Sequence, residues 1–484
     1  MSVKKDIAEG VFWIALAKYS GIFITLAVTA ILARLISPSA FGTIAIAMVI
    51  LYFLNILADI GIGPAVVQYR DLSKKNLNDI FTITIIVGLL LSLVLFSASK
   101  LIADYYNDDT LDIVCQYLCI VIMFNSLNVV PNGLMRREKR FRAIALRTLF
   151  FQFFSGLLAV WAAFHGWGIY ALLVSPIITS IGVFCVNYYN YPQYISLRID
   201  KSSVLTVSSF SIYQFLFSFC NYFSRNLDKL IVGRYFSMSQ LGYYDKSYQL
   251  MMVPVHNISS VIEPVLHPIL ASFQDNVSEL KSKNIRLSQL IAYVSFPIGL
   301  ILYFCGGEII RIMYGSRWDA AIPVFKILAL SLPLQVIFST IAPVYQAAGK
   351  TKVMFWAGIL NTFLTVSGFL IAAFVFGTLE SIAWSWDITL FINFCNSYTL
   401  LHLFVLSESP RPFFFSLLPQ IANSCLVFIM SYFFFSWILI DNTFISLGLK
   451  SMLIALLSIL IAIILKQYKF SDILSVLVMY RKLG

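Results

Sequence analysis

The fold of this chain is decided by a stretch that occurs twice, as ILARLISPSAFG at 31–42 and as IVGRYFSMSQLG at 231–242. The arginine, both serines and the final glycine keep their places in the second copy. Pro64 and Pro264 fall at the same offset. Such self-similarity indicates two like-built halves, and many membrane transporters use two halves to make a central site that opens to either side.

Composition places most of the chain in lipid. Of its 484 residues, 60% are hydrophobic and 12% are charged, and the mean hydropathy is +0.85. A soluble protein of this length could not bury so much apolar surface. The formal net charge is +11, but the basic residues lie in short loops between apolar segments, which is typical of topology signals. We therefore expect an integral membrane protein with no nucleic-acid partner.

About fourteen windows are long and apolar enough for an α-helix to cross roughly 30 Å of hydrocarbon. They cover about 11–35, 41–62, 79–103, 112–134, 144–165, 168–190, 207–233, 241–270, 288–310, 321–346, 353–375, 381–404, 414–438 and 447–465. We predict an all-α membrane fold with two pseudo-symmetric six-helix lobes and two further C-terminal helices. The repeat is parallel because an even number of spans separates its two copies.

The predicted domains follow from these windows. They are an N-lobe at 1–190, a cytoplasmic linker at 191–206, a C-lobe at 207–404, and a C-terminal helix pair with a basic tail at 405–484. If the chain starts in the cytoplasm, most of its 34 basic residues fall on the cytoplasmic side. The positive-inside rule therefore predicts that both termini are cytoplasmic. No loop is long enough for a folded catalytic domain, so we expect no enzyme.

Charged side chains concentrate in the seventh window, where each costs about 2.5–3.5 kcal/mol on insertion scales. This window holds Asn221, Arg225, Asn226, Asp228 and Lys229. Arg225, Asp228 and Lys229 share one helix face because they are three and four residues apart. They form either an Arg225–Asp228 bridge that locks helices together or an Arg225/Lys229 pair facing a watery cavity, with Asp228 orienting it. We prefer the cavity because the trio carries a net positive charge.

The eighth window carries a polar stripe at helical spacing. It consists of Asp245, Gln249, Met252, His256, Ser260, Glu263 and His267. A stripe of this length on one helix face does not face lipid, so it lines a cavity or is buried against other polar helices. We prefer the cavity, in which the titratable members of the stripe and Asp228 would line the path or couple to a cation. Three ligands on one helix face converge poorly, so we expect no metal site.

Two prolines interrupt this same window. Proline frees a backbone carbonyl and kinks a helix. Pro254 and Pro264 are therefore either hinges or static bends.

Cationic residues also occur in the first lobe. Lys18 lies about two helical turns into the first span, and it either snorkels to the cytoplasmic surface or faces the cavity. Arg147 begins the fifth span and is interpreted as a continuation of the preceding basic loop.

Motifs of soluble enzymes do not occur in the sequence. It contains no Walker loop, GxSxG elbow or zincin motif. This argues against an ATP-driven pump or a hydrolase, and we expect no cofactor.

Several segments together resemble a known family. They are FW at 12–13, LARLISPSAFG at 32–42, ADIG at 58–61, NLDKLIVGR at 226–234, and LGYYDK at 241–246 followed by Pro254. These segments are similar to bacterial polysaccharide flippases of the multidrug/oligosaccharidyl-lipid/polysaccharide exporter superfamily. The resemblance is strongest to Wzx-type repeat-unit flippases and colanic-acid-exporter-like members.

The resemblance spans nearly the whole chain and implies a function. The family moves an oligosaccharide repeat unit on undecaprenyl pyrophosphate from the cytoplasmic to the periplasmic leaflet of the bacterial inner membrane, for capsule or lipopolysaccharide assembly. It further implies a V-shaped cavity between two lobes, an ion gradient of H⁺ or Na⁺, and polysaccharide assembly proteins as partners. The lipid tail would remain among the membrane lipids.

The candidate residues are compatible with that substrate. A pyrophosphate carries about two negative charges near neutral pH, which Arg225, Lys229 and Lys18 could pair with. Asn221, Asn226 and Gln249 would suit the sugars. The alternatives are a cation-coupled multidrug exporter of the same fold, whose cavity would be more acidic, and a polysaccharide polymerase or ligase, which would carry a large outer loop.

Overall fold

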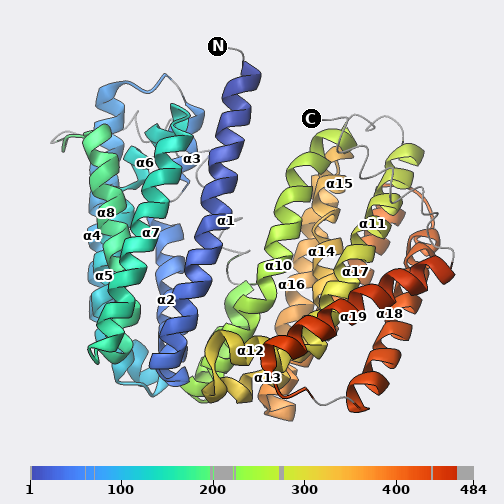
Figure 1. Cartoon of the computed structure of the whole chain (residues 1–484). Coiled ribbons are helices and arrows are strands. Elements are labelled where there is room, and N and C mark those ends of the chain that lie inside the picture. The colour runs from blue at the N-terminus through green and yellow to red at the C-terminus, as the bar shows by residue number, and fades with distance from the viewer. Residues whose placement is uncertain are drawn as a thin grey trace. The chain divides into compact units, whose positions relative to one another are not determined.

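The computed structural model describes residues 3–59, 61–69, 71–196, 200, 222, 225–271, 277–437 and 440–465, and these contain helices and no strand (Figure 1). The chain divides into two compact units, Met1–Gly242 and Tyr243–Gly484. The all-α class predicted from the sequence is confirmed. The predicted linker at 191–206 lies partly outside the described residues, and the predicted domain boundaries stay a prediction.

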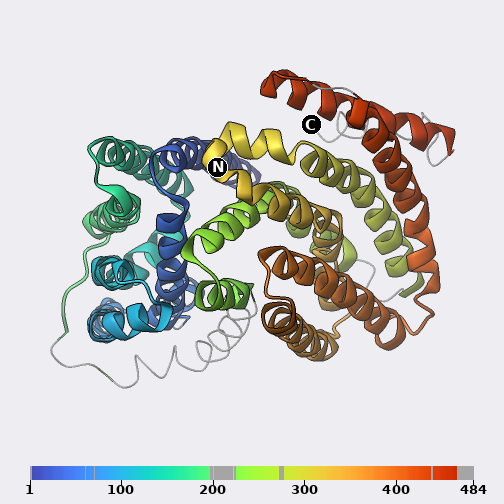
Figure 2. The same cartoon turned by 90° about the horizontal axis from the view of Figure 1, so that it is seen from below.

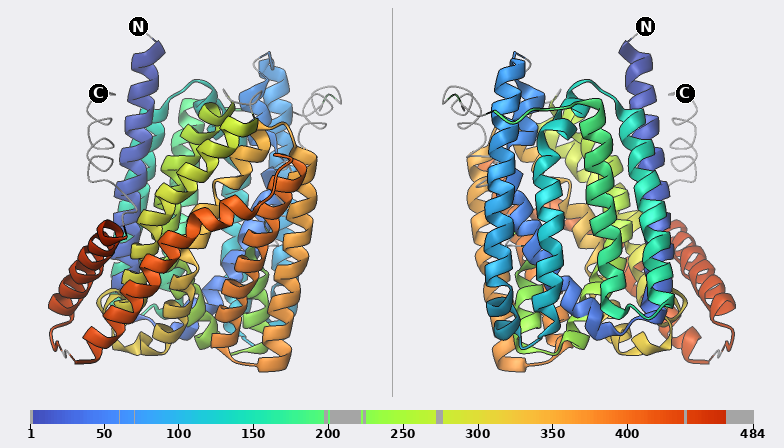
Figure 3. Two further views of the ribbon diagram at one scale, coloured as in Figure 1. Left: turned by 90° about the vertical axis from the view of Figure 1, so that its right-hand side faces the viewer. Right: turned by 90° about the vertical axis from the view of Figure 1, so that its left-hand side faces the viewer.

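The first unit contains long helices joined by short ones. They are α1 (Val3–Leu35), α2 (Pro38–Asp59), α3 (Ile62–Gln68), α4 (Lys74–Tyr106), α5 (Thr110–Leu127), α6 (Val129–Arg137), α7 (Phe141–Phe164), η1 (Gly168–Tyr170) and α8 (Ala171–Asn190). Residues 225–235 are also helical. Within this unit, α4, α5, α7 and α8 run side by side (Figures 1 and 3).

The second unit begins within α10 (Met238–Ala271). The helices that follow are α11 (Val277–Phe304), α12 (Gly306–Tyr314), η2 (Ser316–Ala321), α13 (Ile322–Leu330), α14 (Leu332–Phe338), α15 (Ile341–Ala347), α16 (Thr351–Ile371), the π-helical turn η3 (Ala372–Phe376), α17 (Leu379–Phe404), α18 (Arg411–Trp437) and α19 (Thr443–Ile464).

Among the described residues, 10 helices are long and apolar enough to cross a membrane, and a pair at Ser316–Leu330 and Leu332–Ala347, bent by 41°, brings the number to 11. The windows predicted at 241–270 and 381–404 correspond to α10 and α17, which are long enough but more polar. Most of the window at 207–233 lies outside the described residues. The chain is therefore a multi-pass membrane protein, and the count of fourteen spans stays a prediction.

Helix α4 shows how lipid inverts the usual arrangement of side chains. Leu89, Leu93 and Phe96 are more than half exposed, whereas Asp79 and Thr84 are fully buried. In hydrocarbon an exposed leucine costs nothing, but a polar group has to find its partner inside the protein. Apolar side chains therefore cover the outside of the unit, and polar ones lie between its helices.

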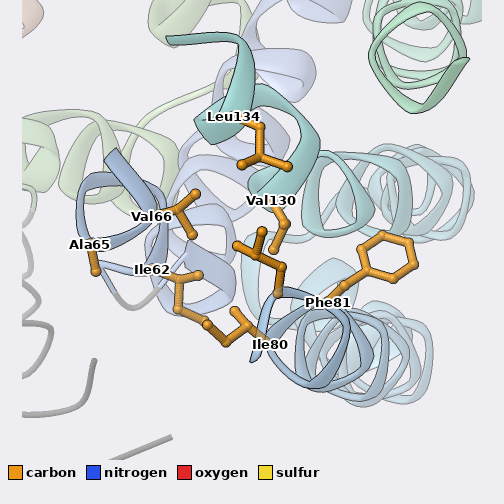
Figure 4. Close-up of a cluster of buried hydrophobic side chains, with 8 residues drawn as sticks. Ile62, Ala65, Val66, Ile80, Phe81, Val130 and Leu134 are labelled. Atoms are coloured by element: carbon orange, nitrogen blue, oxygen red, sulfur yellow. The ribbon is translucent and has the colours of Figure 1, made fainter. Parts of the chain in front are cut away.

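An apolar cluster holds the short helices of the first unit in place. It consists of Ile62, Ala65, Val66, Leu77, Ile80, Phe81, Val130 and Leu134 from α3, α4 and α6 (Figure 4). Gly133 allows α6 to approach α3, because a Cβ there would lie 3.0 Å from the Val66 side chain. Close packing of this kind fixes short helices that could not form alone.

The last two helices attach to the second unit by an apolar core and an ion pair. Leu300 of α11, Val427 of α18, and Ile454 and Ile461 of α19 are buried together, and these helices lie side by side in Figure 2. Lys450 donates to Glu308 of α12 at 2.5 Å, and Ser446 donates to the same oxygen at 2.7 Å. A charge pair with an additional hydrogen bond gives α19 a defined register.

The repeated motif has a structural explanation in both copies. Ser37 accepts a hydrogen bond from the Ala40 amide at 3.4 Å, and Ser237 accepts one from the Gln240 amide at 3.2 Å. The Gln240 side chain accepts in return from the Ser237 amide, which completes a capping box at the start of α10. Both serines therefore start a helix, and Pro38 occupies the first helical position of α2, where proline is favoured.

The final glycines of the two copies pack against each other within the first unit. A Cβ at Gly42 would lie 1.9 Å from the carbonyl oxygen of Met238, and a Cβ at Gly242 would lie 2.1 Å from that of Pro38. The repeat maps Pro38 onto Met238 and Gly42 onto Gly242, so the first contact maps onto the second. This reciprocity is the signature of a two-fold contact. Only glycine permits such a close approach of two backbones.

We expect Gly42→Ala and Gly242→Ala each to lower the free energy of unfolding by about 1–3 kcal/mol or more, because the new methyl group would overlap a backbone oxygen that cannot move aside alone. The measurement is the unfolding temperature of the purified protein in detergent.

Two other helical glycines provide matched controls. A Cβ at Gly358 or Gly448 would meet nothing within 4 Å. Alanine there should leave stability unchanged or raise it by about 0.5–1 kcal/mol. If Gly42→Ala were as stable as Gly358→Ala, the two-fold contact would not be important to the fold.

Candidate functional site

The helix at 225–235 packs on α2 within the first unit. The Tyr222 hydroxyl donates to the Val49 carbonyl at 2.5 Å, and its ring stacks on Phe53 at 6.4 Å between centroids. A Cβ at Gly233 would lie 2.5 Å from the Ile46 side chain, so this glycine is needed for the close contact. These contacts fix the helix that carries the predicted charged trio.

The charged residues of this helix have different surroundings. Arg225 is exposed, Lys229 is half-buried, and Asp228 is 1% exposed. The Asn226 amide donates to the Tyr222 carbonyl at 3.0 Å. Asn221 lies outside the described residues. The exposed guanidinium is available to a ligand, while the Asp228 carboxylate is enclosed by protein.

Lys18, on α1, is half-buried. Its partial exposure is compatible with both roles considered for it from the sequence. Binding of substrate by Lys18 therefore stays a prediction.

The start of the polar stripe on α10 is a local hydrogen-bonded group. The Gln249 amide donates to the Asp245 carboxylate at 2.6 Å, and Lys246 donates to Gln249 at 3.0 Å. The Lys246 ammonium lies 3.8 Å from the same carboxylate. Asp245 is 2% exposed. Asp245 therefore forms part of the packed structure, and Lys246 belongs to the group although the stripe omitted it.

The remaining residues of the polar stripe differ in their exposure. His256 is exposed, Met252 is half-buried, and Ser260 donates to the Asn257 carbonyl at 3.1 Å. The side chains of Glu263 and His267 lie outside the described part of the chain. A cavity-lining or coupling role for these residues stays a prediction.

Helix α10 runs without a break through both prolines. The side chain of Pro264, like those of its neighbours at 263 and 265, is not described. Whether Pro254 and Pro264 act as hinges stays a prediction.

Polar residues that were not predicted meet between α16 and α17 in the second unit. The Asn361 amide donates to the Ser397 hydroxyl at 2.7 Å, and the Asn393 amide donates to Thr365 at 2.9 Å. Asn396 donates to the Asn361 side chain at 3.1 Å. Asn393 and Ser397 are buried, and the other three residues are half-buried. We call these five residues the amide network.

Asp387 lies on α17, two turns before the asparagines of the amide network. Both of its carboxylate oxygens are buried, and neither accepts a hydrogen bond from any described residue. The neighbouring Ser331 hydroxyl donates instead to the Leu328 carbonyl at 2.6 Å. An isolated buried carboxylate is costly, so it either binds a proton or pairs with a cation. Among the described residues of the second unit, Asp387 is therefore a candidate for binding a cation or a proton.

One sequence signal could have identified Asp387. The window at 381–404 contains a single carboxylate in an otherwise apolar run, together with several asparagines and serines. A lone charge inside a span is a functional candidate by default. The seventh and eighth windows contain more charged residues and therefore carry the stronger sequence signal.

Solved structures share this fold. The lipid II flippase MurJ in an inward closed conformation aligns with a TM-score of 0.74 at 15% identity, covering 96% of this chain and 100% of that one. An inward-facing multidrug resistance MATE family transporter of the MOP superfamily aligns with a TM-score of 0.58 at 14% identity, covering 78% of this chain and 93% of that one. At these identities the similarity establishes the fold alone.

Relatives of this chain are named for polysaccharide biosynthesis. The teichuronic acid biosynthesis protein TuaB of Bacillus subtilis is 25% identical over 81% of this chain and 82% of its own length. The lipopolysaccharide biosynthesis protein WzxC of Escherichia coli is 24% identical, covering 86% of this chain and 85% of its own. The succinoglycan biosynthesis transport protein ExoT of Rhizobium meliloti is 24% identical, covering 78% and 77%.

The sequence profile of one family spans more than half of the chain. Residues 31–323 match it, and this range contains both copies of the repeated motif. The resemblance predicted from the sequence is thereby confirmed: this chain belongs to the polysaccharide biosynthesis protein family.

Proposed function

We propose that this chain is a flippase that moves oligosaccharide repeat units linked to undecaprenyl pyrophosphate from the cytoplasmic to the periplasmic leaflet. Membership in the polysaccharide biosynthesis protein family carries this proposal. A multi-pass fold like that of a lipid II flippase supports it, since that protein is also named as a flippase. Both termini would be cytoplasmic, and the two six-helix lobes would open alternately to the two sides.

The substrate's charge suggests which residues bind it. A pyrophosphate needs cations at membrane depth, and Arg225 and Lys229 occupy successive turns of one helix. Arg225 is exposed and can therefore reach a ligand. Lys18, Asn226 and Gln249 are further proposed contacts. The protein would shield only the polar head, while the lipid tail stays in the bilayer.

We further propose that an H⁺ or Na⁺ gradient drives transport through Asp387. Its carboxylate is buried without a hydrogen-bond donor among the described residues, and the α17 members of the amide network lie on the same helix. Amide and hydroxyl oxygens together with a carboxylate are suitable ligands for a small hard cation. A site whose occupancy changes its charge can couple ion movement to a conformational change.

A cation-coupled multidrug exporter is the second candidate. The fold shared with a MATE family transporter favours it. The two functions differ in their effect on cells: a drug exporter would change drug resistance and leave surface glycans unchanged.

A strain that lacks this gene should lose its surface polysaccharide and accumulate the lipid-linked repeat unit on the cytoplasmic side, because the proposed flippase presents this precursor to the outer leaflet. A plasmid copy should restore export. The double variant Arg225→Ala/Lys229→Ala should restore it poorly, at less than about a tenth of the wild-type rate if two charged contacts are lost. Surface polysaccharide and extracted precursor are measured together.

Lys350→Ala is the matched control, since it removes an exposed cation from a loop. Normal export without the gene would exclude the proposed function. Normal export by the double variant would exclude only the proposed role of Arg225 and Lys229 in binding the substrate.

Asp387→Asn should abolish the response of transport to an imposed H⁺ or Na⁺ gradient, because the amide can neither bind a proton nor balance a cation. The protein should remain folded, with an unfolding temperature equal to or above that of the wild type, since the variant removes a buried carboxylate that is costly to enclose. Transport is measured in vesicles with and without the gradient.

Glu380→Gln provides the comparison for Asp387→Asn, because Glu380 is exposed in the first turn of the same helix. A gradient response of Asp387→Asn equal to that of Glu380→Gln would show that Asp387 is not the coupling group.

A further inference from the structure

Arg147 of α7 is a half-buried cation held by neutral groups. Its guanidinium donates to the side-chain oxygens of Asn187, and of Asn132 at 3.4 Å, and it contacts the Met135 sulfur at 3.5 Å. Asn187 is fully buried and donates in turn to Asn128 at 2.6 Å. Among the described residues no carboxylate forms an ion pair with Arg147. The position of Arg147 in the sequence suggests that it continues the basic loop. In the structure, however, asparagine side chains hold its guanidinium in a defined place.

The charge of this site is only partly compensated, because the Asp59 carboxylate interacts with Arg136 but three guanidinium groups lie in the cluster. Arg136 lies close enough to repel the Arg147 guanidinium. Arg137, beside it, has a buried terminal nitrogen with no hydrogen-bond partner in the described part of the chain. Amide oxygens satisfy hydrogen bonds but carry no net charge, so the cluster keeps an excess of positive charge. Such an excess in a partly desolvated place attracts an anion strongly.

An apolar crevice opens beside Arg147. It is an open groove with a volume of about 660 Å³ between α1, α7 and α8, and Ile24, Leu146, Phe150, Phe153 and Val186 line it together with Arg147. Leu146, Phe150 and Phe153 are about half exposed. Its volume is that of a small-molecule site. The crevice is thus apolar along its walls, and Arg147 borders it at one place.

Contacts between α1 and α7 show in which order the residues of the crevice follow one another. Arg142 lies over the Trp13 ring at 5.1 Å, Gln152 donates to the Gly21 carbonyl at 2.8 Å, and Gly156 packs against Val28. The two helices therefore run in the same direction. Arg142 and Arg147 are at one end, and Phe150 and Phe153 follow toward the other. An amphiphile with an anionic head and a long apolar tail matches this order.

We propose that the crevice between α1, α7 and α8 binds a polyprenyl phosphate, with the phosphate at Arg147 and the first isoprenoid units along Ile24, Phe150 and Phe153. This inference rests on the proposed function, which supplies a polyprenyl carrier as the lipid that this chain meets. The crevice would hold the carrier by its phosphate and tail, independently of which sugar is attached.

The test is photo-crosslinking in lipid nanodiscs with radiolabelled undecaprenyl phosphate, a carrier without sugar. The full-length variant Phe150→p-benzoylphenylalanine should be labelled on irradiation. Excess unlabelled undecaprenyl phosphate should suppress labelling, whereas the same amount of phosphatidylglycerol should not. Phe355→p-benzoylphenylalanine, at an exposed position of α16, gives the background for lipid contact.

In the Phe150 variant, Arg147→Gln should lower specific labelling at least about tenfold, because a charged contact to phosphate is lost. Arg147→Lys should retain more labelling than Arg147→Gln, since it keeps the charge without the planar guanidinium. Arg411→Gln removes an exposed cation at the start of α18 and should leave labelling unchanged.

Labelling that equals the Phe355 background, that phosphatidylglycerol suppresses equally well, or that Arg147→Gln leaves unchanged would overturn this inference. Binding is measured without transport, so the two proposals can fail separately. If the protein is labelled specifically but moves no lipid-linked oligosaccharide, the proposed binding site in the crevice is supported and the proposed flippase function is contradicted.

Discussion

The hydrocarbon around this chain offers no hydrogen bonds, and the arrangement of side chains depends on that constraint. Apolar side chains such as Leu93 and Phe96 can remain exposed, whereas Asn187 and Asn393 find partners on neighbouring helices. Thr84 donates to a carbonyl of its own helix. Two groups stand out against this background. Asp387 is a buried carboxylate with no donor among the described residues, and Arg147 is a half-buried cation with neutral partners. In a medium this unfavourable to charge, both are expected to serve a ligand.

The repeated motif combines three structural requirements in a few residues. Ser37 and Ser237 cap the helices that follow, and Gly42 and Gly242 allow the first turns of these helices to touch. Arg34 and Arg234 lie at the ends of the preceding helices, where a cation is favoured by the helix dipole. The same residues therefore recur because both copies make the same helix end, cap and crossing. This reciprocal contact is what the pseudo-symmetric plan predicted from the sequence would require at this place.

Sequence reasoning succeeded where length and apolarity decide the outcome. The windows at 144–165 and 447–465 match α7 and α19 closely, because an uninterrupted apolar run can only be a spanning helix. The window at 321–346 contains three short helices, since breaks at Ser331 and Thr340 depend on local packing that no window measures. Burial was equally hard to predict. Asp245 and His256 share a predicted face, yet the first is buried and the second is exposed, because neighbouring helices cover only part of α10.

The central claim is that this chain moves a lipid-linked oligosaccharide between leaflets. The most direct measurement uses the purified protein in sealed liposomes, with undecaprenyl-pyrophosphate-linked oligosaccharide in both leaflets and a membrane-impermeant glycosidase added outside. The account predicts that the glycosidase digests nearly all of the oligosaccharide at a rate that increases with the amount of protein. Digestion that stops at the outer-leaflet half, as in protein-free liposomes, both with and without an ion gradient, would contradict the account.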